Sequence, residues 1–525
     1  MTRSSQAQRT TGSLRRLLFT EPRRPAGIRE SQRAHWYVVG TVCIGAFMGQ
    51  LDASIVTLAL PRLGHDLHAS VGAVEWVALA YLLVLVATVA TVGRIADTVG
   101  RKLLYVYGFA VFTVGSVLCG FAPSLLVLIA ARVIQAIGAA MLQANSVALI
   151  TEAMPRKLLG RAIGVQGTAQ ALGLALGPLV GGVLLALGGW RLIFLVNLPA
   201  GAIGLALGWF LLPRSRSRRE PARGDHLGAL LIALGAAGPL VYLSLASHTG
   251  YASPQLLLAL AAGLLAAVWF VRRERRLDAP LIDLKLLRRP TIAVGLASGL
   301  VSYLVLFGVL FVVPYYLSAQ HVDFALIGLQ LSLLPLGIGI AAPIAGRLLG
   351  RIGERALTSG GLIVTAAGLL EIVIWHDTPG LLIGLALAGL GLGAFTPANN
   401  ATIMKAAPAG HAGVISGVLN MSRGMGTALG IALASALYTA AARTAGAHPT
   451  PVAAGHGLAL ALAVLSCIAL AVGLALLTNR AEANRVALPL ALGDVPARSA
   501  DPSVSDSSAR ENAAHDRPAR SKAVG

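Results

Sequence analysis

Long apolar segments recur along this chain and are separated by short polar loops. About fourteen of them lie between residues 36 and 477. Each reaches the roughly 20 residues that a helix needs to cross about 30 Å of hydrocarbon. With 56% hydrophobic and 12% charged residues, the chain also has too little polar surface to solvate a globule of 525 residues. The pattern predicts an all-α polytopic membrane protein with fourteen transmembrane helices.

The basic residues lie mainly in alternate loops. The intervening loops hold only Arg62, Arg191 and Arg443, although the chain contains 42 lysines and arginines and carries a net charge of +20. An excess of Lys and Arg on one side is typical of cytoplasmic loops. We therefore expect both termini and the basic loops in the cytoplasm. Arginine predominates over lysine, a bias that indicates a GC-rich bacterial source, so we expect a multi-pass protein of a bacterial inner membrane. A nucleic-acid binder would have no reason to alternate its charge, so no nucleic-acid partner is expected.

The tails and the cysteines add little chemistry. Residues 1–34 are rich in Arg, Ser and Thr but lack an apolar core before the first span, which predicts a disordered cytoplasmic tail rather than a cleaved signal. Residues 478–525 have the same character. All three cysteines fall inside apolar segments, so no disulfide is expected. His65 and His68 have no further ligand near them, and no metal site is expected.

A segment that occurs twice defines the organisation. Residues 93–102 (GRIADTVGRK) and 346–355 (GRLLGRIGER) match in both glycines, in the first arginine and in the charges that follow. Such a repeat predicts two parallel six-span halves, at 35–212 and 291–477. Residues 213–290, between the halves, hold two inserted spans and two basic loops.

Six motifs lie in order on successive parts of the chain. They cover residues 51–61 (LDASIVTLALP), 93–102, 132–140 (RVIQAIGAA), 173–182 (GLALGPLVGG), 190–199 (WRLIFLVNLP) and 413–430. They resemble the signatures of the major facilitator superfamily, and of its 14-span drug:proton antiporters in particular. The resemblance covers about residues 36–477. It implies the major facilitator fold, with two six-helix halves and two inserted helices.

The resemblance also implies roles for two motifs. Gly93, Asp97, Gly100, Arg101 and Lys102 would form a gating latch between the halves. The antiporter motif would consist of Gly173, Gly177, Pro178, Gly181 and Gly182, whose glycines every fourth residue permit close helix approach. Two positions depart from the family pattern. Ala136 replaces a glycine, and Gly350 replaces an acid of the second latch, so we expect the two latches to be unequal.

Few charges lie within the spans. Asp52 and Arg132 come to a similar depth, where an ion is costly unless it is paired or faces water. We interpret Asp52 as the proton-coupling acid and Arg132 as its charge partner; a purely structural ion pair is the alternative. Glu371 and Arg423 are secondary candidates for coupling or substrate contact, with solvated snorkelling the alternative for Glu371.

Two further acids and several polar or aromatic residues complete the candidates. Glu75 and Asp323 lie at span ends, where we expect solvated loop-end acids. Amides and aromatic rings within the spans predict either a cavity lining or contacts that hold helices together. These cavity candidates are Gln50, Tyr81, Gln135, Gln170, Tyr303, Phe307, Asn399, Asn400 and Asn420.

The sequence contains no phosphate-binding loop of the Walker type and no nucleophile motif. We therefore expect no enzyme and no cofactor, and the energy source left is an ion gradient. The resemblance to drug:proton antiporters implies that this is a proton gradient. The predicted function is proton-coupled export of drugs or other amphipathic small molecules by a monomer in contact with membrane lipid. A dedicated exporter of one metabolite, antibiotic or lipid is the alternative. A transport-inactive sensor or scaffold is the alternative from another class.

Overall fold

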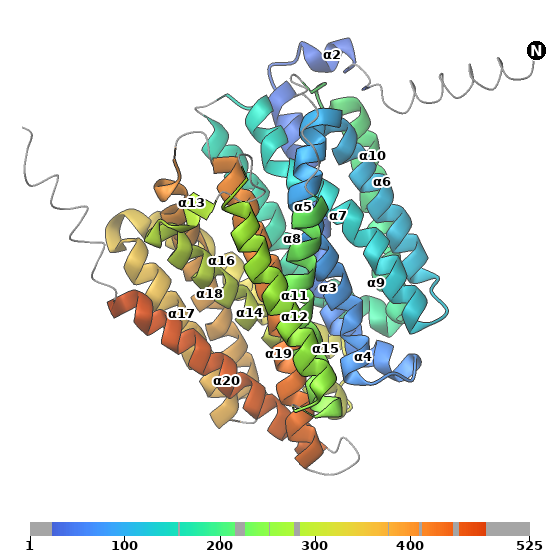
Figure 1. The fold of residues 1–525 in the computed structure, drawn as a ribbon, viewed down its shortest axis with the longest axis vertical. Helices are drawn as coiled ribbons and strands as arrows, with labels where there is room; N and C mark the ends of the chain where they lie inside the picture. The colour runs from blue at the N-terminus through green and yellow to red at the C-terminus, as the bar shows by residue number, and fades with distance from the viewer. Residues whose placement is uncertain are drawn as a thin grey trace, which may run out of the picture. The chain divides into compact units, whose positions relative to one another are not determined.

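The computed structural model describes residues 21, 24–155, 158–215, 226–250, 252–277, 284–375, 377–408, 412–444 and 451–478. The tails 1–20 and 479–525 and the centre of the loop 213–226 lie outside these ranges, so the expectations for them are not addressed. Within the described residues, fourteen helical stretches are long and apolar enough to span a membrane. The predicted span number and all-α class are confirmed (Figure 1).

The first half contains six spans. Two of them are divided by a break in the helix, and the short helix α2 precedes the first span. Its helices are α2 (Ala26–Arg29), α3 (Ala34–Asp66), α4 (Val71–Val74), α5 (Trp76–Val99), α6 (Arg101–Gly120), α7 (Leu125–Ala153), α8 (Leu159–Gly188), α9 (Trp190–Leu195) and α10 (Asn197–Leu211). The α4–α5 break falls at Glu75 and the α9–α10 break at Val196. We call the end of the spans that carries α4 the α4 end, and the opposite end, with residues 93–102, the basic end.

The inserted pair and the second half follow. The inserted helices are α11 (His226–Thr249) and α12 (Pro254–Glu274), and the second half comprises α13 (Leu284–Leu287), α14 (Pro290–Ala319), α15 (Phe324–Leu331), α16 (Leu333–Ile352), α17 (Glu354–Ile374), α18 (Thr378–Ala406), α19 (Ala412–Thr444) and α20 (Pro451–Thr478). Helix α11 packs against α12 and also contacts α5 and α19, which belong to different halves. The inserted pair is therefore joined to both halves through α11.

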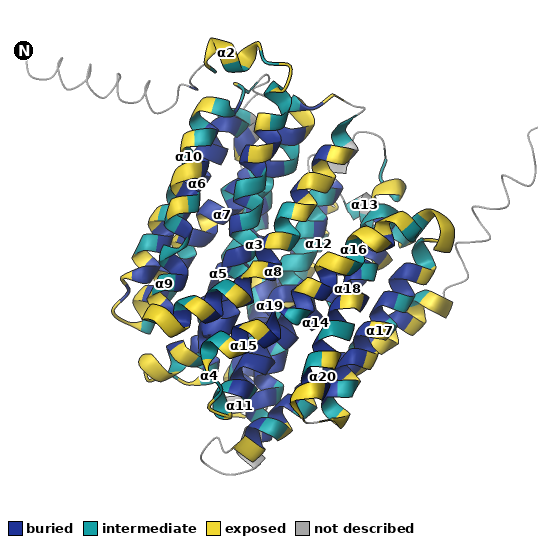
Figure 2. Ribbon diagram, turned by 180° about the vertical axis from the view of Figure 1, so that it is seen from behind, coloured by how far each residue is buried: buried dark blue, intermediate teal, exposed yellow. Residues whose placement is uncertain are grey.

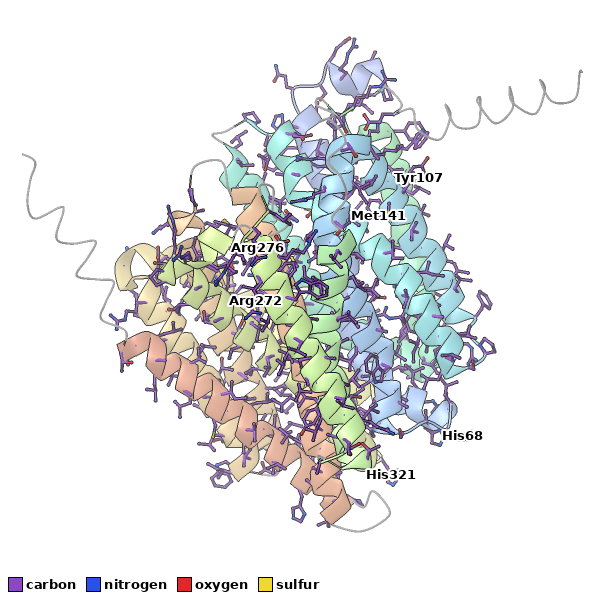
Figure 3. The ribbon with its side chains drawn as sticks, in the orientation of Figure 1. His68, Tyr107, Met141, Arg272, Arg276 and His321 are labelled. Atoms are coloured by element: carbon purple, nitrogen blue, oxygen red, sulfur yellow. The ribbon has the colours of Figure 1, made fainter. Side chains whose placement is uncertain are left out.

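The two halves share one packing pattern. In the first half α3 packs on α8, α6 on α7 and α5 on α7; in the second, α14 packs on α19, α17 on α18 and α16 on α18. The turn after the first long helix also recurs, because His68 and His321 both have positive φ, of 50° and 59°. Figure 3 shows both histidines near the end where α4 lies, away from Arg272 and Arg276 of α12 and the loop after it. The repeat seen in the sequence thus extends to backbone detail.

Burial follows the expected division between protein and lipid. Buried residues such as Phe109, Phe311 and Leu465 lie between helices, whereas outward faces of the helices are exposed and apolar (Figure 2). On α12, Leu258 and Leu265 are each 69% exposed. In an aqueous solvent such faces would be unfavourable, but in a bilayer they contact lipid tails. This arrangement is that of a multi-pass membrane protein.

Candidate functional site

A fully buried ion pair lies in the first half. The carboxylate of Asp52 on α3 accepts a hydrogen bond of 2.6 Å from Nη1 of Arg132 on α7. Its other oxygen, Oδ1, accepts bonds of 2.8 Å from Nε2 of Gln135 and 3.0 Å from Nδ2 of Asn197. Asp52 and Arg132 are 0% and 1% exposed. Three donors, one of which carries the counter-charge, provide what an ionised carboxylate requires when it is removed from water.

The remaining groups of this network satisfy Arg132 and Gln135. Nε of Arg132 donates to the carbonyl of Val77 at 2.9 Å, and Nη1 also donates to Oε1 of Gln135 at 2.6 Å. Gln135 in turn donates to Oγ of Ser116 at 2.8 Å. The guanidinium carbon of Arg132 lies 4.1 Å from the centre of the Tyr81 ring, a cation–π distance. Arg132 therefore remains bound to protein groups even where Asp52 takes up a proton.

Local sequence explains how these residues meet. Arg132 and Gln135 are three residues apart on α7, so both lie on the same helix face. Asn197 is the first residue of α10, because the break at Val196 separates α9 from α10 within one span. Asn197 was recognised in the 190–199 motif but was given no role, and Ser116 was missed. Short-range pattern identifies an amide within a motif but not the acid that it will reach on another helix.

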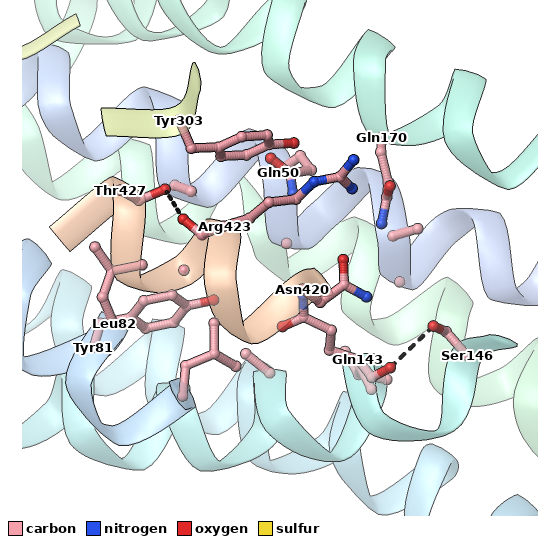
Figure 4. Close-up of a pocket in the computed structure, with 18 of the residues that line it drawn as sticks. Gln50, Tyr81, Leu82, Gln143, Ser146, Gln170, Tyr303, Asn420, Arg423 and Thr427 are labelled. Carbon is pink, nitrogen blue, oxygen red and sulfur yellow. Dashed lines mark hydrogen bonds between the residues drawn. The ribbon is translucent and has the colours of Figure 1, made fainter. Parts of the chain in front are cut away.

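A separate cavity lies between the two halves. It contains about 790 Å³ not filled by protein atoms, part of it open to solvent. Figure 4 shows polar and aromatic side chains from both halves around it. Of the predicted cavity candidates, the lining includes Gln50, Tyr81, Gln170, Tyr303, Phe307 and Asn420. It also includes a further amide within a span, Gln143, and two hydroxyl residues that were not among the candidates, Ser146 and Thr427.

Three of the predicted cavity candidates are not part of this lining, and they take the other expected role, contacts that hold helices together. Gln135 is 0% exposed because it belongs to the Asp52 network. Asn399 is buried and donates to the carbonyl of Gly295 at 3.0 Å, which holds α18 to α14. Asn400 accepts a bond of 2.6 Å from Nη2 of Arg423. An amide in a span serves equally well in helix pairing, so residue type cannot separate the two roles.

Tyr81 is shared by the cavity and the ion pair. It is 3% exposed, it lines the cavity, and its ring faces the guanidinium of Arg132. Arg132 and Asp52 themselves do not reach the lining. A molecule in the cavity would therefore contact the ion pair through the ring of Tyr81. The arrangement places a protonatable acid one side chain away from a cavity lined by polar and aromatic groups of both halves.

Arg423 and Glu371 occupy different environments. Arg423 on α19 is half-buried and lines the cavity, with its guanidinium carbon 5.2 Å from the Tyr303 ring centre. Glu371 on α17 is half-buried but does not line the cavity. Of these two secondary candidates, only Arg423 is placed to touch a ligand in this structure.

The repeated segments form equivalent ion pairs of opposite polarity. Arg101 on α6 donates to Glu152 on α7 at 2.7 Å, and Glu354 on α17 pairs with Lys405 on α18. Both pairs join residues 51 apart in the sequence. The loss of the acid at position 350 therefore does not leave the second segment without an ion pair, and the two segments differ in the polarity of their pairs. Position 350 has lost its acid, but the acid at 354 supplies a pair in which the charges are exchanged.

Two further residues of the first latch, Lys102 and Gly100, stabilise the turn into α6 and its contact with α10. Nζ of Lys102 donates to the carbonyl of Leu212 at the end of α10 at 2.7 Å. Gly100 has φ of +119°, a conformation that a side chain would strain, and so permits the sharp turn between α5 and α6. Gly93 lies within α5. The side chain of Asp97 lies outside the described residues, so its expected role in the latch is not addressed.

The antiporter motif on α8 has two packing faces. Gly173 lies against the α3 backbone at Phe47. Gly177 lies against the Ser54 side chain, and Gly181 lies against the Ile55 side chain. Gly182 faces the other half: a Cβ there would be 2.6 Å from the carbonyl oxygen of Phe324 and 3.0 Å from Cα of Gly328. Pro178 lies inside the helix between these contacts. The motif thus brings α8 close to the Asp52 helix on one side and to the second half on the other.

The expectation of a solvated Glu75 is wrong. Glu75 is 0% exposed, and neither of its carboxyl oxygens has a hydrogen-bond partner within the described part of the chain. Ser244 of α11 and Ser435 of α19 lie beside it because these helices pack over the α4–α5 break. Asp323, in contrast, is exposed and caps α15 through a bond from the Ala325 amide at 2.8 Å, as expected for a loop-end acid.

The sequence of this chain is similar to those of known transporters. The family model described as Major Facilitator Superfamily matches residues 42–299 and 295–508. The multidrug resistance protein Stp of Mycobacterium tuberculosis (strain ATCC 25618 / H37Rv) is 33% identical over 402 residues, covering 76% of this chain and 74% of Stp. The riboflavin transporter RibZ of Clostridioides difficile (strain 630) is 32% identical, covering 77% and 88%. The tetracenomycin C resistance and export protein of Streptomyces glaucescens is 31% identical, covering 77% and 76%.

Solved structures support the fold. A bacterial homolog of the human lysosomal transporter Spinster, crystallised in an inward-facing and unoccupied conformation, has a TM-score of 0.62 and 17% identity. The match covers 85% of this chain and 96% of that one. Together with two similarly packed halves and two inserted helices, these matches establish that the chain is a transporter and not an enzyme. The chain belongs to the Major Facilitator Superfamily, among its multidrug-type transporters.

Proposed function

We propose that the protein exports amphipathic small molecules across the cytoplasmic membrane in exchange for protons, with Asp52 as the proton carrier. The observation that carries this proposal is the position of Asp52. It is a fully buried acid bound by Arg132 and two amides, and it is connected to the cavity through Tyr81. An acid within the membrane interior is a functional candidate by default.

The proposed cycle follows from the contacts of the ion pair. A proton on Asp52 removes the charge that Arg132 neutralises, and this weakens the contact between α3 and α7. Substrate in the cavity displaces Tyr81 and so alters the cation–π contact on the other side of Arg132. Proton and substrate therefore bias the same ion pair, which is the requirement for their exchange.

Alternating access requires contacts that break at one end of the molecule. Gly182 of α8 and Gly328 of α15 place the backbones of the two halves in close contact. Opening of the α4 end must separate them.

We place the basic end in the cytoplasm because it carries most of the Lys and Arg residues. Single cysteines at Ser217 and Thr249 in a Cys-free protein test this orientation, since only Thr249→Cys should react with an impermeant reagent in intact cells.

Proteoliposomes test the function. The purified full-length protein is reconstituted with a pH-sensitive dye inside, and planar aromatic compounds such as riboflavin and tetracenomycin C, named for the relatives, are added outside. We expect at least one compound to cause proton movement that protein-free vesicles lack, and a proton gradient to drive uphill movement of that compound. Transport that persists unchanged after a protonophore collapses the gradient would contradict proton coupling. A dedicated exporter would respond to one compound of a broad panel; a multidrug exporter would respond to several.

A further inference from the structure

The cavity contains a cation without an acidic partner. Among the described residues that line it, Arg423 carries the only charge, and no Asp or Glu is present. None of the salt bridges within the described part of the chain involves Arg423. A guanidinium cannot lose its proton in a protein, so its charge persists in every step of transport.

Arg132 and Arg423 both lie within the spans, but they differ in how their charge is neutralised. Arg132 is paired with Asp52 at 2.6 Å and is 1% exposed. Arg423 donates one bond, from Nη2 to Oδ1 of Asn400 at 2.6 Å, and Asn400 is a neutral acceptor. Figure 4 shows the Arg423 guanidinium in the cavity, close to Gln50 and Gln170. A guanidinium has five N–H donors, so Arg423 retains donors for a further acceptor within the cavity.

Aromatic rings stand beside this cation. The rings of Tyr303 and Phe307 are stacked, with centroids 6.2 Å apart and an interplanar angle of 23°. Both residues line the cavity, and Tyr81 lines it from the first half. Aromatic walls favour planar aromatic ligands through offset stacking. Amides from both halves, including Gln143 and Asn420, add donors and acceptors around the same space.

We propose that Arg423 anchors the substrate, and that the cavity selects planar aromatic molecules bearing an acidic or acceptor-rich group over lipophilic cations. This inference rests on the proposed export function and names its substrate class. A carboxylate or enolate accepts two parallel bonds from a guanidinium. A quaternary ammonium ion finds no carboxylate in the cavity and meets the positive charge of Arg423. The aromatic rings by themselves would attract a cationic ligand, but the positive charge of Arg423 repels that ligand over the same few ångströms.

Binding to the purified full-length protein in nanodiscs tests the selection. The probes share one planar ring system: 7-methoxycoumarin-3-carboxylate, its neutral carboxamide, and its amide with a trimethylammonioethyl group. Their intrinsic fluorescence reports binding by anisotropy. We expect the carboxylate to bind about 10- to 100-fold more tightly than the carboxamide, the range for hydrogen bonds to a charged group. The cation should bind most weakly.

Variants at position 423 assign this preference to the guanidinium. Arg423→Gln removes the charge and keeps a donor, so it should weaken carboxylate binding to the level of the carboxamide while carboxamide affinity changes by less than about 3-fold. The cationic probe should bind more tightly to this variant, a gain that misfolding would not produce. Arg423→Lys should retain part of the preference, because it keeps the charge but loses the planar fork. Arg289→Gln, at the basic end and outside the cavity lining, is the matched control and should equal wild type.

The outcomes separate this inference from the proposed function. A preference of the wild type for the cation, binding of none of the three probes, or a carboxylate preference unchanged in Arg423→Gln would overturn it. In proteoliposomes, proton-driven transport of the cation with none of the carboxylate would leave the exporter intact and refute the selection. Carboxylate binding that depends on Arg423, without proton-driven movement of any probe, would refute the exporter and retain the binding site.

Discussion

Replacement of Asp52 by Asn should remove proton coupling and destabilise the first half. Asn keeps the shape of Asp but has one acceptor oxygen and one NH₂ group. With its oxygen toward Arg132, its NH₂ group faces the two amide donors that Asp52 Oδ1 now accepts, at 2.8 Å from Gln135 and 3.0 Å from Asn197. Two hydrogen bonds are lost, and Arg132 becomes an uncompensated buried cation.

The magnitude follows from that loss. Removal of one partner of a buried ion pair costs about 3–5 kcal/mol. Arg132→Gln should cost less than Asp52→Asn, because an unpaired Asp52 is able to take up a proton whereas an unpaired Arg132 cannot lose one. The double variant removes both charges, so its free energy of unfolding should recover by about 2–3 kcal/mol relative to the sum of the single changes.

Two assays check this prediction. Unfolding of the purified variants in detergent gives the stabilities, and dye-loaded proteoliposomes report substrate-driven proton movement. Asp52→Asn should abolish that movement, whereas Glu371→Gln, a half-buried acid outside the cavity lining, should retain it and change stability by less than about 0.5 kcal/mol. The reasoning is refuted if Asp52→Asn still performs gradient-driven efflux, or if the two single changes add without coupling.

Three further predictions concern the latch, the helix contact and the orphan acid. Arg101→Glu should impair efflux from cells, and the double variant Arg101→Glu/Glu152→Arg should restore it. The reason is that the equivalent pair of the second half already carries the exchanged polarity. Failure of the double variant to restore efflux would show that the polarity matters. Gly182→Ala should reduce efflux, because its Cβ would lie 2.6 Å from a carbonyl oxygen. Gly164→Ala on the same helix should not reduce efflux, because nothing lies within 4 Å of the added Cβ. Equal losses of efflux would exclude the close contact as the cause. Glu75→Met should keep or raise the unfolding temperature. It keeps the length of the side chain and removes two buried oxygens that lack a hydrogen-bond partner within the described part of the chain, and a buried unsatisfied polar group costs about 1–3 kcal/mol. A clear destabilisation would mean that Ser244, Ser435 or another group bonds the carboxyl group in the membrane.

The number and class of the spans are properties of local sequence. A helix crosses a bilayer when about 20 consecutive residues are apolar, and this requirement is met or failed within each segment. Backbone groups in hydrocarbon must bond within their own helix, so little else is possible for such a segment. The repeat at 93–102 and 346–355 is likewise a property of the sequence, and it indicates two equivalent halves without reference to the contacts between them.

The pairing of Asp52 with Arg132 was also accessible from sequence, because both charges had to lie at similar depth and an ion in hydrocarbon needs a partner. The other members of the network were not. Asn197 reaches Asp52 only because a helix break and the packing of α3, α7 and α10 bring them within 3.0 Å, across 145 residues of chain. Hydrogen bonds of that range depend on tertiary packing, which no local pattern encodes.

Tertiary structure alone decided which polar residues face the cavity and which are buried between helices. Gln50 and Gln170 line the cavity, whereas Gln135, of the same residue type, is sealed against Asp52. Glu75 has the sequence context of a loop-end acid, but α11 and α19 pack over it. Hydropathy places a residue along the membrane normal. The rotation of its helix and the neighbours on each face are set by packing between helices, so the side to which a side chain points is decided only when the bundle assembles.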